Sequence, residues 1–377
     1  MPTIDILPGN ATNLERTLSA SGDPLNRLAT GPTATHGWKV NSPPVSLFPW
    51  LIYEYGLGEL SPYIADQAQL ITLGKQWQRL RGTVSSVAMG LGWLGYTATI
   101  EEAPSRRTRW NLFQLALGRV RDVETPDLDR IEGIAGLSVA LRSKFFRGFS
   151  GYDVRATETS YTKTSASILS NMSGARIRDD GALWSFGRKY EYDYQPTQAE
   201  LTSLGVWIAP SASPFTWATS TFPWSLATFP WGATVNSVRK GLMAALLALK
   251  TCWVEFKDAG GNVIGYRKCR AVHQVVAATG VSAIFSVGIN SFAVGTPTSE
   301  ILYLEGMSGF GDGNGAVAVT AALRFDAYPA DLTKPGVIWV GPGQLVTPLP
   351  AVAQRAVSIP FGRTVREQVK TLMRITV

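Results

Sequence analysis

The stretch LFPWLIYEYGLGELSPYIADQAQLITLGKQWQRLRGTVSSVAMGLGWLG, residues 47–95, decides the architecture of the first half of this chain. It predicts two amphipathic helices joined by a tight turn at Arg81-Gly82-Thr83, where Gly82 ends one helix and Thr83 caps the next. Ser61-Pro62 is expected to start the first helix. Apolar residues recur at helical spacing, at Leu70, Leu73, Trp77 and Leu80 and at Val84, Val87, Leu91 and Leu94.

An aromatic and apolar cluster precedes these helices, from Phe48 to Tyr55. Such surface gains roughly 25 cal/mol per Å² when it leaves water, so it needs a partner surface. Two amphipathic helices joined by one turn cannot bury both of their stripes alone. We therefore interpret the stretch as a docking element whose stripes are covered by other proteins. Its predicted contact residues are Trp50, Tyr53, Leu70, Trp77, Leu80, Val87 and Leu91.

Spaced segments of the chain carry a family resemblance. They are LPGNATNLER at 7–16, LFPWLIYEYG at 47–56, RGT at 81–83 and WLG at 93–95, followed by SGYDVRA at 150–156 and SFGR at 185–188. In this order they resemble the tail protein I family, the baseplate wedge components of contractile-tailed bacteriophages. The chain departs from the family pattern at residues 77–80, WQRL, where the family often has a His and further basic residues.

The resemblance implies a structural protein of the virion tail baseplate, synthesised in the host cytoplasm. It implies a hetero-oligomeric wedge with other baseplate proteins and six wedges around a central hub. It also implies that tail fibres can attach to this protein. The amphipathic helices would then join those of partner subunits in a shared bundle.

Length and composition predict an α+β fold of two or three domains, since 377 residues exceed one ordinary core. A hydrophobic content of 45% with 17% charged residues indicates a globular chain. We predict an extended arm over 1–46, with a short helix around 13–20, and a tail protein I-like helical and mixed wedge domain over 47–190. A β-rich domain over 191–350 and a C-terminal tail with a short helix over 351–377 follow.

Local signals predict further elements. Thr125-Pro126 opens a helix expected to run to Gly148, and Asn236 caps a helix with Val238, Leu242, Ala245 and Leu249 on one face. Residues 253–257 and 263–268 predict a hairpin around the turn at 258–262. Residues 364–367, TVRE, have capping-box spacing and predict the short C-terminal helix.

Charge and hydropathy argue against nucleic-acid and membrane partners. The net charge of +7 is spread along the chain without a long Lys/Arg run, which favours a solvated or protein-facing surface. The basic patch at 105–109, SRRTR, is interpreted as a loop or protein contact rather than a nucleic-acid site. The uncharged stretches 83–100, 201–238 and 271–299 are interrupted by Gly, Pro or polar residues, so none predicts a membrane span. The first ten residues lack signal-peptide features.

One internal repeat stands out, with Phe and Trp recurring every seven residues as PFTW, TFPW and TFPW. Three interpretations remain open: aromatics packed on one another, a contact with another tail protein, or a platform for sugar rings. The last would make the chain a host-surface carbohydrate-binding protein, the alternative function. The residues are Phe215, Trp217, Phe222, Trp224, Phe229 and Trp231.

The sequence predicts no catalytic residue, cofactor or metal. Cys252, Cys269 and His273 fall one ligand short of a zinc site, so paired buried thiols are the favoured interpretation. The glycine-rich loop at 309–315 is followed by a strand-like run and lacks the Lys-Ser/Thr of a phosphate-binding loop. It also offers too few oxygens for calcium. Two histidines and no G-x-S-x-G motif argue against a hydrolase.

Overall fold

The structure, a computed structural model, describes residues 7–22, 31, 43–102, 110–151, 173–210, 235–280, 283–334 and 336–377. The chain divides into two compact units, Met1–Gly95 with Gly133–Ala140 and Tyr96–Glu132 with Leu141–Val377. Helices dominate the first unit and a large mixed sheet dominates the second, which confirms the predicted α+β class. This division differs from the predicted domain ranges, because strands from both sides of the predicted boundary at residue 190, between residues 98 and 374, pair in one sheet.

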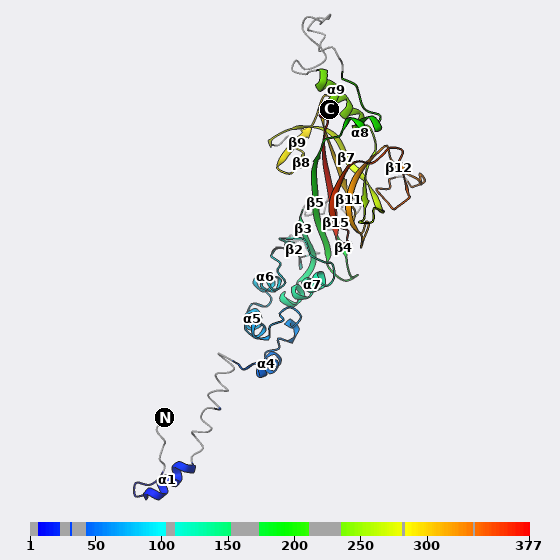
Figure 1. The fold of residues 1–377 in the computed structure, drawn as a ribbon. Coiled ribbons are helices and arrows are strands. Elements are labelled where there is room, and N and C mark those ends of the chain that lie inside the picture. Colours follow the sequence, from blue (N-terminus) through cyan, green and yellow to red (C-terminus); the bar gives the residue numbers. More distant parts are fainter. Residues whose placement is uncertain are drawn as a thin grey trace, which may run out of the picture. The chain divides into compact units, whose positions relative to one another are not determined.

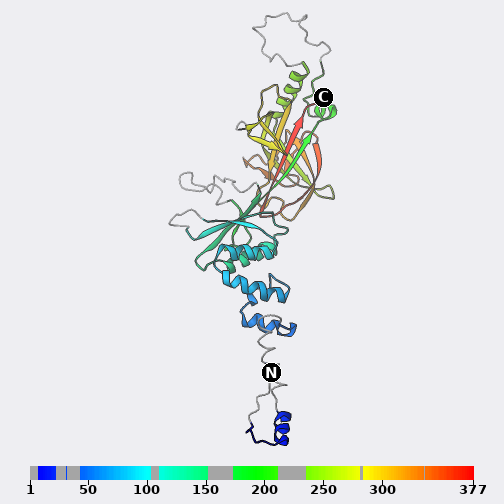
Figure 2. The ribbon, with the colours of Figure 1, turned by 90° about the vertical axis from the view of Figure 1, so that its left-hand side faces the viewer.

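Short helices build the first unit, coloured blue to cyan in Figures 1 and 2. The predicted turn between two of them is present: Gly82 has φ +90°, and the Thr83 hydroxyl accepts the Ser86 N–H at 3.4 Å. The predicted start of the helix before this turn at Ser61 is wrong, because that helix begins at Gln67 and is capped by the Asp66 carboxylate. The helices are α1 (Asn13–Gly22), η1 (Val45–Leu47), α4 (Phe48–Glu54), η2 (Gly58–Leu60), α5 (Gln67–Leu80), α6 (Val84–Trp93) and the end of α7 (Asp127–Ser138).

Helix α7 ends ten residues before the predicted stop at Gly148. Its last carbonyls are bonded by the α5–α6 turn. The Ser138 carbonyl accepts the Gly82 N–H at 2.8 Å and the Ser86 hydroxyl at 2.8 Å, and the Leu137 carbonyl accepts Arg81 Nε at 3.0 Å. Because these donors satisfy carbonyl groups that have no partner within α7, the helix can end at Ser138. Residues 144–151 form a strand instead.

Fourteen of the described strands form one sheet in the second unit. The path β1-β2-β3-β5-β16-β10-β7-β6-β11-β15 is joined at its sides by β4, β8, β9 and β13. The strands are β1 (Ala98–Glu102), β2 (Leu112–Leu117), β3 (Lys144–Gly151), β4 (Ala175–Arg176), β5 (Leu183–Tyr194), β6 (Cys252–Lys257), β7 (Val263–Ala277), β8 (Phe285–Val287), β9 (Asn290–Val294), β10 (Ile301–Met307), β11 (Val317–Phe325), β13 (Trp339–Val340), β15 (Val352–Pro360) and β16 (Val365–Arg374).

The sheet changes character at β16. Strands β2, β3, β5 and β16 are parallel neighbours, whereas every pair along the path from β16 to β15 is antiparallel. The predicted hairpin is confirmed as β6 and β7, with the Asp258 carboxylate accepting the Asn262 N–H at 2.8 Å in the turn. A separate pair consists of β12 (Tyr328–Pro329) and β14 (Leu345–Val346).

The prediction of a C-terminal helix is wrong, because these residues form β16 in the middle of the sheet. Val365 lies opposite Phe186 of β5, and the pairing continues along the strand. Glu367, predicted to complete a capping box, instead accepts a hydrogen bond from Arg188 Nε at 3.0 Å. Residues 351–377 are therefore not a tail. The predicted boundary at residue 190 falls inside β5.

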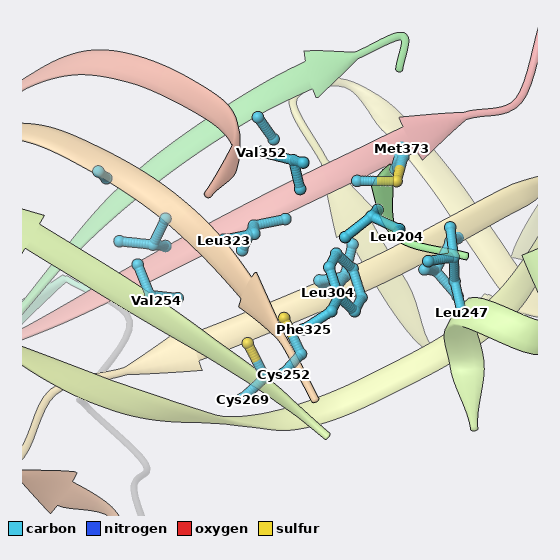
Figure 3. Close-up of a cluster of buried hydrophobic side chains, with 14 of the residues drawn as sticks. Leu204, Leu247, Cys252, Val254, Cys269, Leu304, Leu323, Phe325, Val352 and Met373 are labelled. Atoms are coloured by element: carbon cyan, nitrogen blue, oxygen red, sulfur yellow. The ribbon is translucent and has the colours of Figure 1, made fainter. Parts of the chain in front are cut away.

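The strands from β5 to β15 enclose a buried apolar cluster, part of which is drawn in Figure 3. No backbone ladder joins β15 to β5 among the described residues. Three side-chain bonds close this gap: Arg188 Nη2 to the Pro360 carbonyl at 2.6 Å, the Tyr190 hydroxyl to the Ser358 carbonyl at 3.0 Å, and Arg355 Nη2 to the Asp193 carbonyl at 3.0 Å. Positions rise on β5 as they fall on β15, so the strands run antiparallel. Side chains thus complete a barrel.

Helices α8 (Gln198–Ser203) and α9 (Val235–Ala248) lie near the C-terminus in both ribbon views (Figures 1 and 2). Helix α9 packs on the barrel core through Met243, Ala244 and Leu247. The predicted face is wrong, because Leu242 is 50% exposed and Leu249 84% exposed. Residues 242–248 of this helix, LMAALLA, are all Leu, Met or Ala, so the sequence pattern does not select one face. No helix in the described ranges is long and apolar enough to cross a membrane.

Removing one partner of the buried Arg188–Glu367 pair is expected to destabilise the barrel. The Glu367 side chain is fully buried and that of Arg188 is 23% exposed. Arg188→Ala would leave the carboxylate uncompensated and should lower the free energy of unfolding by about 3–5 kcal/mol in chemical denaturation. Burial raises the pKa of Glu367, an effect that Arg188 opposes. Glu367→Gln, which removes the buried charge, should therefore cost less than Arg188→Ala.

The matched control is the Arg374–Asp193 pair on the same two strands. Its side chains are 32% and 48% exposed, and Arg374 Nε lies 2.6 Å from Asp193 Oδ2. An exposed ion pair contributes at most about 1 kcal/mol, so Arg374→Ala should have a small effect. Equal losses for Arg188→Ala and Arg374→Ala would contradict the importance given to the buried pair.

Candidate interaction surface

Helix α4 presents two large aromatic side chains to solvent. Pro49 lies in its first turn, where the missing N–H costs no hydrogen bond. Trp50 is 71% exposed and Tyr53 is 85% exposed, whereas Leu51 is 4% exposed. Residues three apart lie on the same side of a helix, so Trp50 and Tyr53 form one aromatic face. We call this pair the α4 aromatic face.

The end of α4 is tied to α5. Gln78 Nε2 donates to the Tyr55 carbonyl at 2.6 Å, and Lys75 Nζ lies 5.4 Å from the centre of the Tyr55 ring. Leu57, which follows α4, is 1% exposed and packs on Gly74, where an added Cβ would lie 2.8 Å from Leu57 Cδ2. The α4 aromatic face is therefore carried on an ordered helical scaffold rather than on an isolated helix.

The apolar stripe of α5 and α6 is buried by the chain itself. The side chains of Leu70, Trp77, Val87 and Leu91 are 2%, 2%, 1% and 0% exposed. The prediction that other proteins complete this stripe is therefore wrong at these four positions. Leu80 is only partly buried.

The end of α7 supplies the missing cover. Trp77 Nε1 donates to the Ser138 hydroxyl at 2.9 Å, and the Trp77 and Trp93 ring centres lie 6.5 Å apart. Gly90 lets Ile134 approach, since a Cβ there would lie 2.5 Å from Ile134 Cγ1. Ile134 lies 44 positions from Gly90, and Ser138 lies 61 positions from Trp77, so local spacing could not reveal the contact with α7. Trp77 belongs to the core of the first unit.

The structure adds exposed apolar residues that the predicted contact set omits. Val45, just before α4, is 73% exposed. On α1, which the sequence correctly predicts as a short helix, Leu14 and Leu18 are 70% and 63% exposed, and the helix buries no residue. Their spacing of four was the available signal. A ten-residue helix is marginal alone in water, so α1 is typical of a segment stabilised by a partner.

Hydrogen bonds hold the start of α1. The Thr12 N–H donates to Glu15 Oε2 at 2.7 Å, and the Thr12 hydroxyl donates to the same oxygen at 2.9 Å. These bonds lower the pKa of Glu15. The carboxylate also lies in the first turn, where its charge complements the helix dipole.

Two predicted surfaces lie outside the described residues. One is the basic patch at 105–109. The other is the aromatic repeat of Phe215, Trp217, Phe222, Trp224, Phe229 and Trp231. Both stay predictions.

The residues considered for chemistry have structural partners. Cys252 and Cys269 are buried free thiols, and His273 stacks on Phe285 with ring centres 5.5 Å apart. In the loop at 309–315, Asp312 Oδ2 accepts the Gly309 N–H at 2.6 Å and Arg267 Nη1 at 2.7 Å. The described part of the chain contains no group of three or more His, Cys, Asp or Glu side chains arranged to hold a metal ion.

Comparison with known families bears on the α4 aromatic face. Residues 7–137 match the model of a family described as phage tail protein (Tail_P2_I), which confirms the resemblance found in the sequence. The matched range, about a third of the chain, includes α1, α4, α5 and α6. A search of curated proteins found no match.

Replacing Trp77 and Trp50 one at a time should show that the first is a core residue and the second a surface residue. Trp77→Ala should lower the free energy of unfolding by about 3–5 kcal/mol, because it leaves a cavity and an unpaired Ser138 hydroxyl. Trp50→Ala should change it by less than about 0.5 kcal/mol, because the ring is exposed. Chemical denaturation of the full chain measures both. Similar losses for the two variants would contradict this assignment.

Proposed function

We propose that this chain, whose residues 7–137 match the model of a phage tail protein family, is a structural wedge subunit of a contractile-tail baseplate. It would act by assembling with other baseplate proteins rather than by catalysis. The observation that carries the proposal is the α4 aromatic face, which lies inside the matched range and is left uncovered by the described chain. The location in the virion tail follows from the same family.

The chemistry of the α4 aromatic face supports a protein contact. Exposed apolar surface gains roughly 25 cal/mol per Å² on burial. Trp and Tyr are enriched at the centres of protein interfaces, where a few such residues dominate the binding energy. Charged residues follow in the chain at Glu54 and Glu59, both exposed, and can form the polar rim of such an interface. An aromatic centre beside charged residues is typical of a specific contact.

Fixed geometry suits an assembly role. The α5–α6 stripe is packed internally, so α4 is presented on a scaffold that forms without the partner. Binding then costs less conformational entropy than it would for a flexible segment. This replaces the shared helix bundle expected from the sequence with docking of a preformed surface.

The second unit is proposed to reach neighbouring wedges or tail fibres. Its barrel is closed by side-chain bonds and carries buried ion pairs such as Lys370 with Glu191, whose Nζ and Oε1 atoms lie 3.1 Å apart.

The alternative function, binding of host-surface carbohydrate, rests on the aromatic repeat and finds no support among the described residues.

Replacing both aromatics tests the proposal. The double variant Trp50→Ala/Tyr53→Ala should reduce co-purification with co-expressed baseplate proteins, and incorporation into tails, by at least about 30-fold, as expected for loss of an interface hot spot. Its melting temperature should match that of the parent, because both side chains are exposed.

Tyr328→Ala is the matched control. Tyr328 is 47% exposed and lies outside the matched range, so its removal should leave binding through the α4 aromatic face unchanged. Normal incorporation of the double variant would refute the proposed contact. A full-length chain that binds no co-expressed tail protein would refute the assembly role itself.

A further inference from the structure

Two cysteines face each other inside the barrel. Strands β6 and β7 are antiparallel, with Trp253 opposite Lys268. Continuing this register by one residue puts Cys252 opposite Cys269. Both side chains belong to the same core cluster, with exposures of 2% and 9%, so they point to the same side of the sheet. Figure 3 shows their sulfur atoms near one another in the barrel interior.

The backbone geometry at this position fits a disulfide. Opposed residues of an antiparallel pair have Cα atoms about 4.5–5.5 Å apart and Cβ atoms at similar separations. A disulfide takes Cα separations of about 4.4–6.8 Å and Cβ separations of about 3.5–4.5 Å. Only a small approach of the Cβ atoms is required. The thiols already interact, since burial and then the hydrogen bond with Cys269 raise the pKa of Cys252.

We propose that Cys252 and Cys269 are a site of intrachain disulfide formation once the chain leaves a reducing compartment. Only the timing rests on the proposed function: a tail protein is made in the reducing cytoplasm and then persists outside the cell. The bond would close the end of the β6–β7 hairpin opposite its turn at 258–262, inside the apolar core.

A small-molecule disulfide such as oxidised glutathione can serve as the oxidant. Cys269, the more exposed thiol, loses its proton and attacks one sulfur of the oxidant, and one glutathione thiolate leaves. Cys252 then loses its proton and attacks the Cys269 sulfur of the mixed disulfide, and the second glutathione thiolate leaves. The two protons end on the two glutathione thiols. Two electrons pass from the protein to the oxidant, and one S–S bond replaces another.

Burial should make this reaction slow and dependent on pH. In the second step the attacking species is the Cys252 thiolate, and the raised pKa of Cys252 makes this thiolate rare at neutral pH. The rate should therefore increase as the pH rises from 7 to 9. Once formed, the bond should be difficult for dilute reductant to reach, because both sulfurs lie in the core.

The test uses the purified full-length chain, freed of reductant and incubated with oxidised glutathione at pH 7 and pH 9. The native protein should lose the mass of two hydrogen atoms and retain no glutathione. Peptide mapping should then give one cross-linked species containing Cys252 and Cys269. The melting temperature should rise by roughly 3–6 °C and return on reduction, since the cross-link restricts the unfolded chain.

Single variants distinguish the order of attack. Cys252→Ala should accumulate a glutathione adduct on Cys269, whereas Cys269→Ala should react much more slowly, because Cys252 is 2% exposed. A melting curve confirms that each variant is folded. The parent unfolded in denaturant, treated in the same way, shows that the cross-link can be detected.

The proposal would be overturned if the native parent protein kept two free thiols after incubation with oxidised glutathione at pH 9. Glutathione on both cysteines, or cross-links between chains, would also overturn it. If a variant does not fold, the result for the native parent alone decides. Failure here leaves the baseplate role unaffected, since the α4 contact requires no cysteine. Failure of the α4 test would leave the disulfide of the purified chain unaffected.

Discussion

The parallel pairing of β5 with β16 is the constraint on which the second unit depends. These strands place Arg188 and Glu367, 179 positions apart in sequence, in direct contact. Strand β16 has parallel strands on one side and antiparallel strands on the other, so it joins the two parts of the sheet. Without the last residues of the chain, the sheet would lack its middle strand. The burial of Lys370 and Glu367 on this strand is tolerated because Glu191 and Arg188 pair with them.

Features that depend on neighbouring residues could be predicted from the sequence. The turn at 81–83 and the hairpin around 258–262 are set by glycines at positive φ and by the Thr83 and Asp258 side chains, which bond backbone groups within a few positions. The last strand could not be predicted, because VREQVKTLMR also has helical spacing and its partners lie far away in the chain. The end of α7 was missed for the same reason, since the groups that bond its carbonyls belong to the α5–α6 turn.

The candidate surface shows the same limit. The sequence places Trp50 and Tyr53 in an aromatic cluster and Trp77 on an amphipathic helix, and it predicts all three as contact residues without distinguishing exposed from buried ones. The structure distinguishes them, because the end of α7 covers Trp77 and leaves the other two exposed. Internal packing of the α5–α6 stripe gives α4 a fixed support, and the proposed assembly contact rests on the aromatics that this packing leaves uncovered. The family match and the exposed pair coincide within residues 7–137.

The most direct measurement of the central claim is a cryo-electron microscopy reconstruction of the assembled tail at side-chain resolution. The proposed role predicts that atoms of a neighbouring subunit lie within about 4 Å of the Trp50 and Tyr53 rings, while Trp77 contacts only its own chain. A tail in which Trp50 and Tyr53 face solvent in every copy would contradict it.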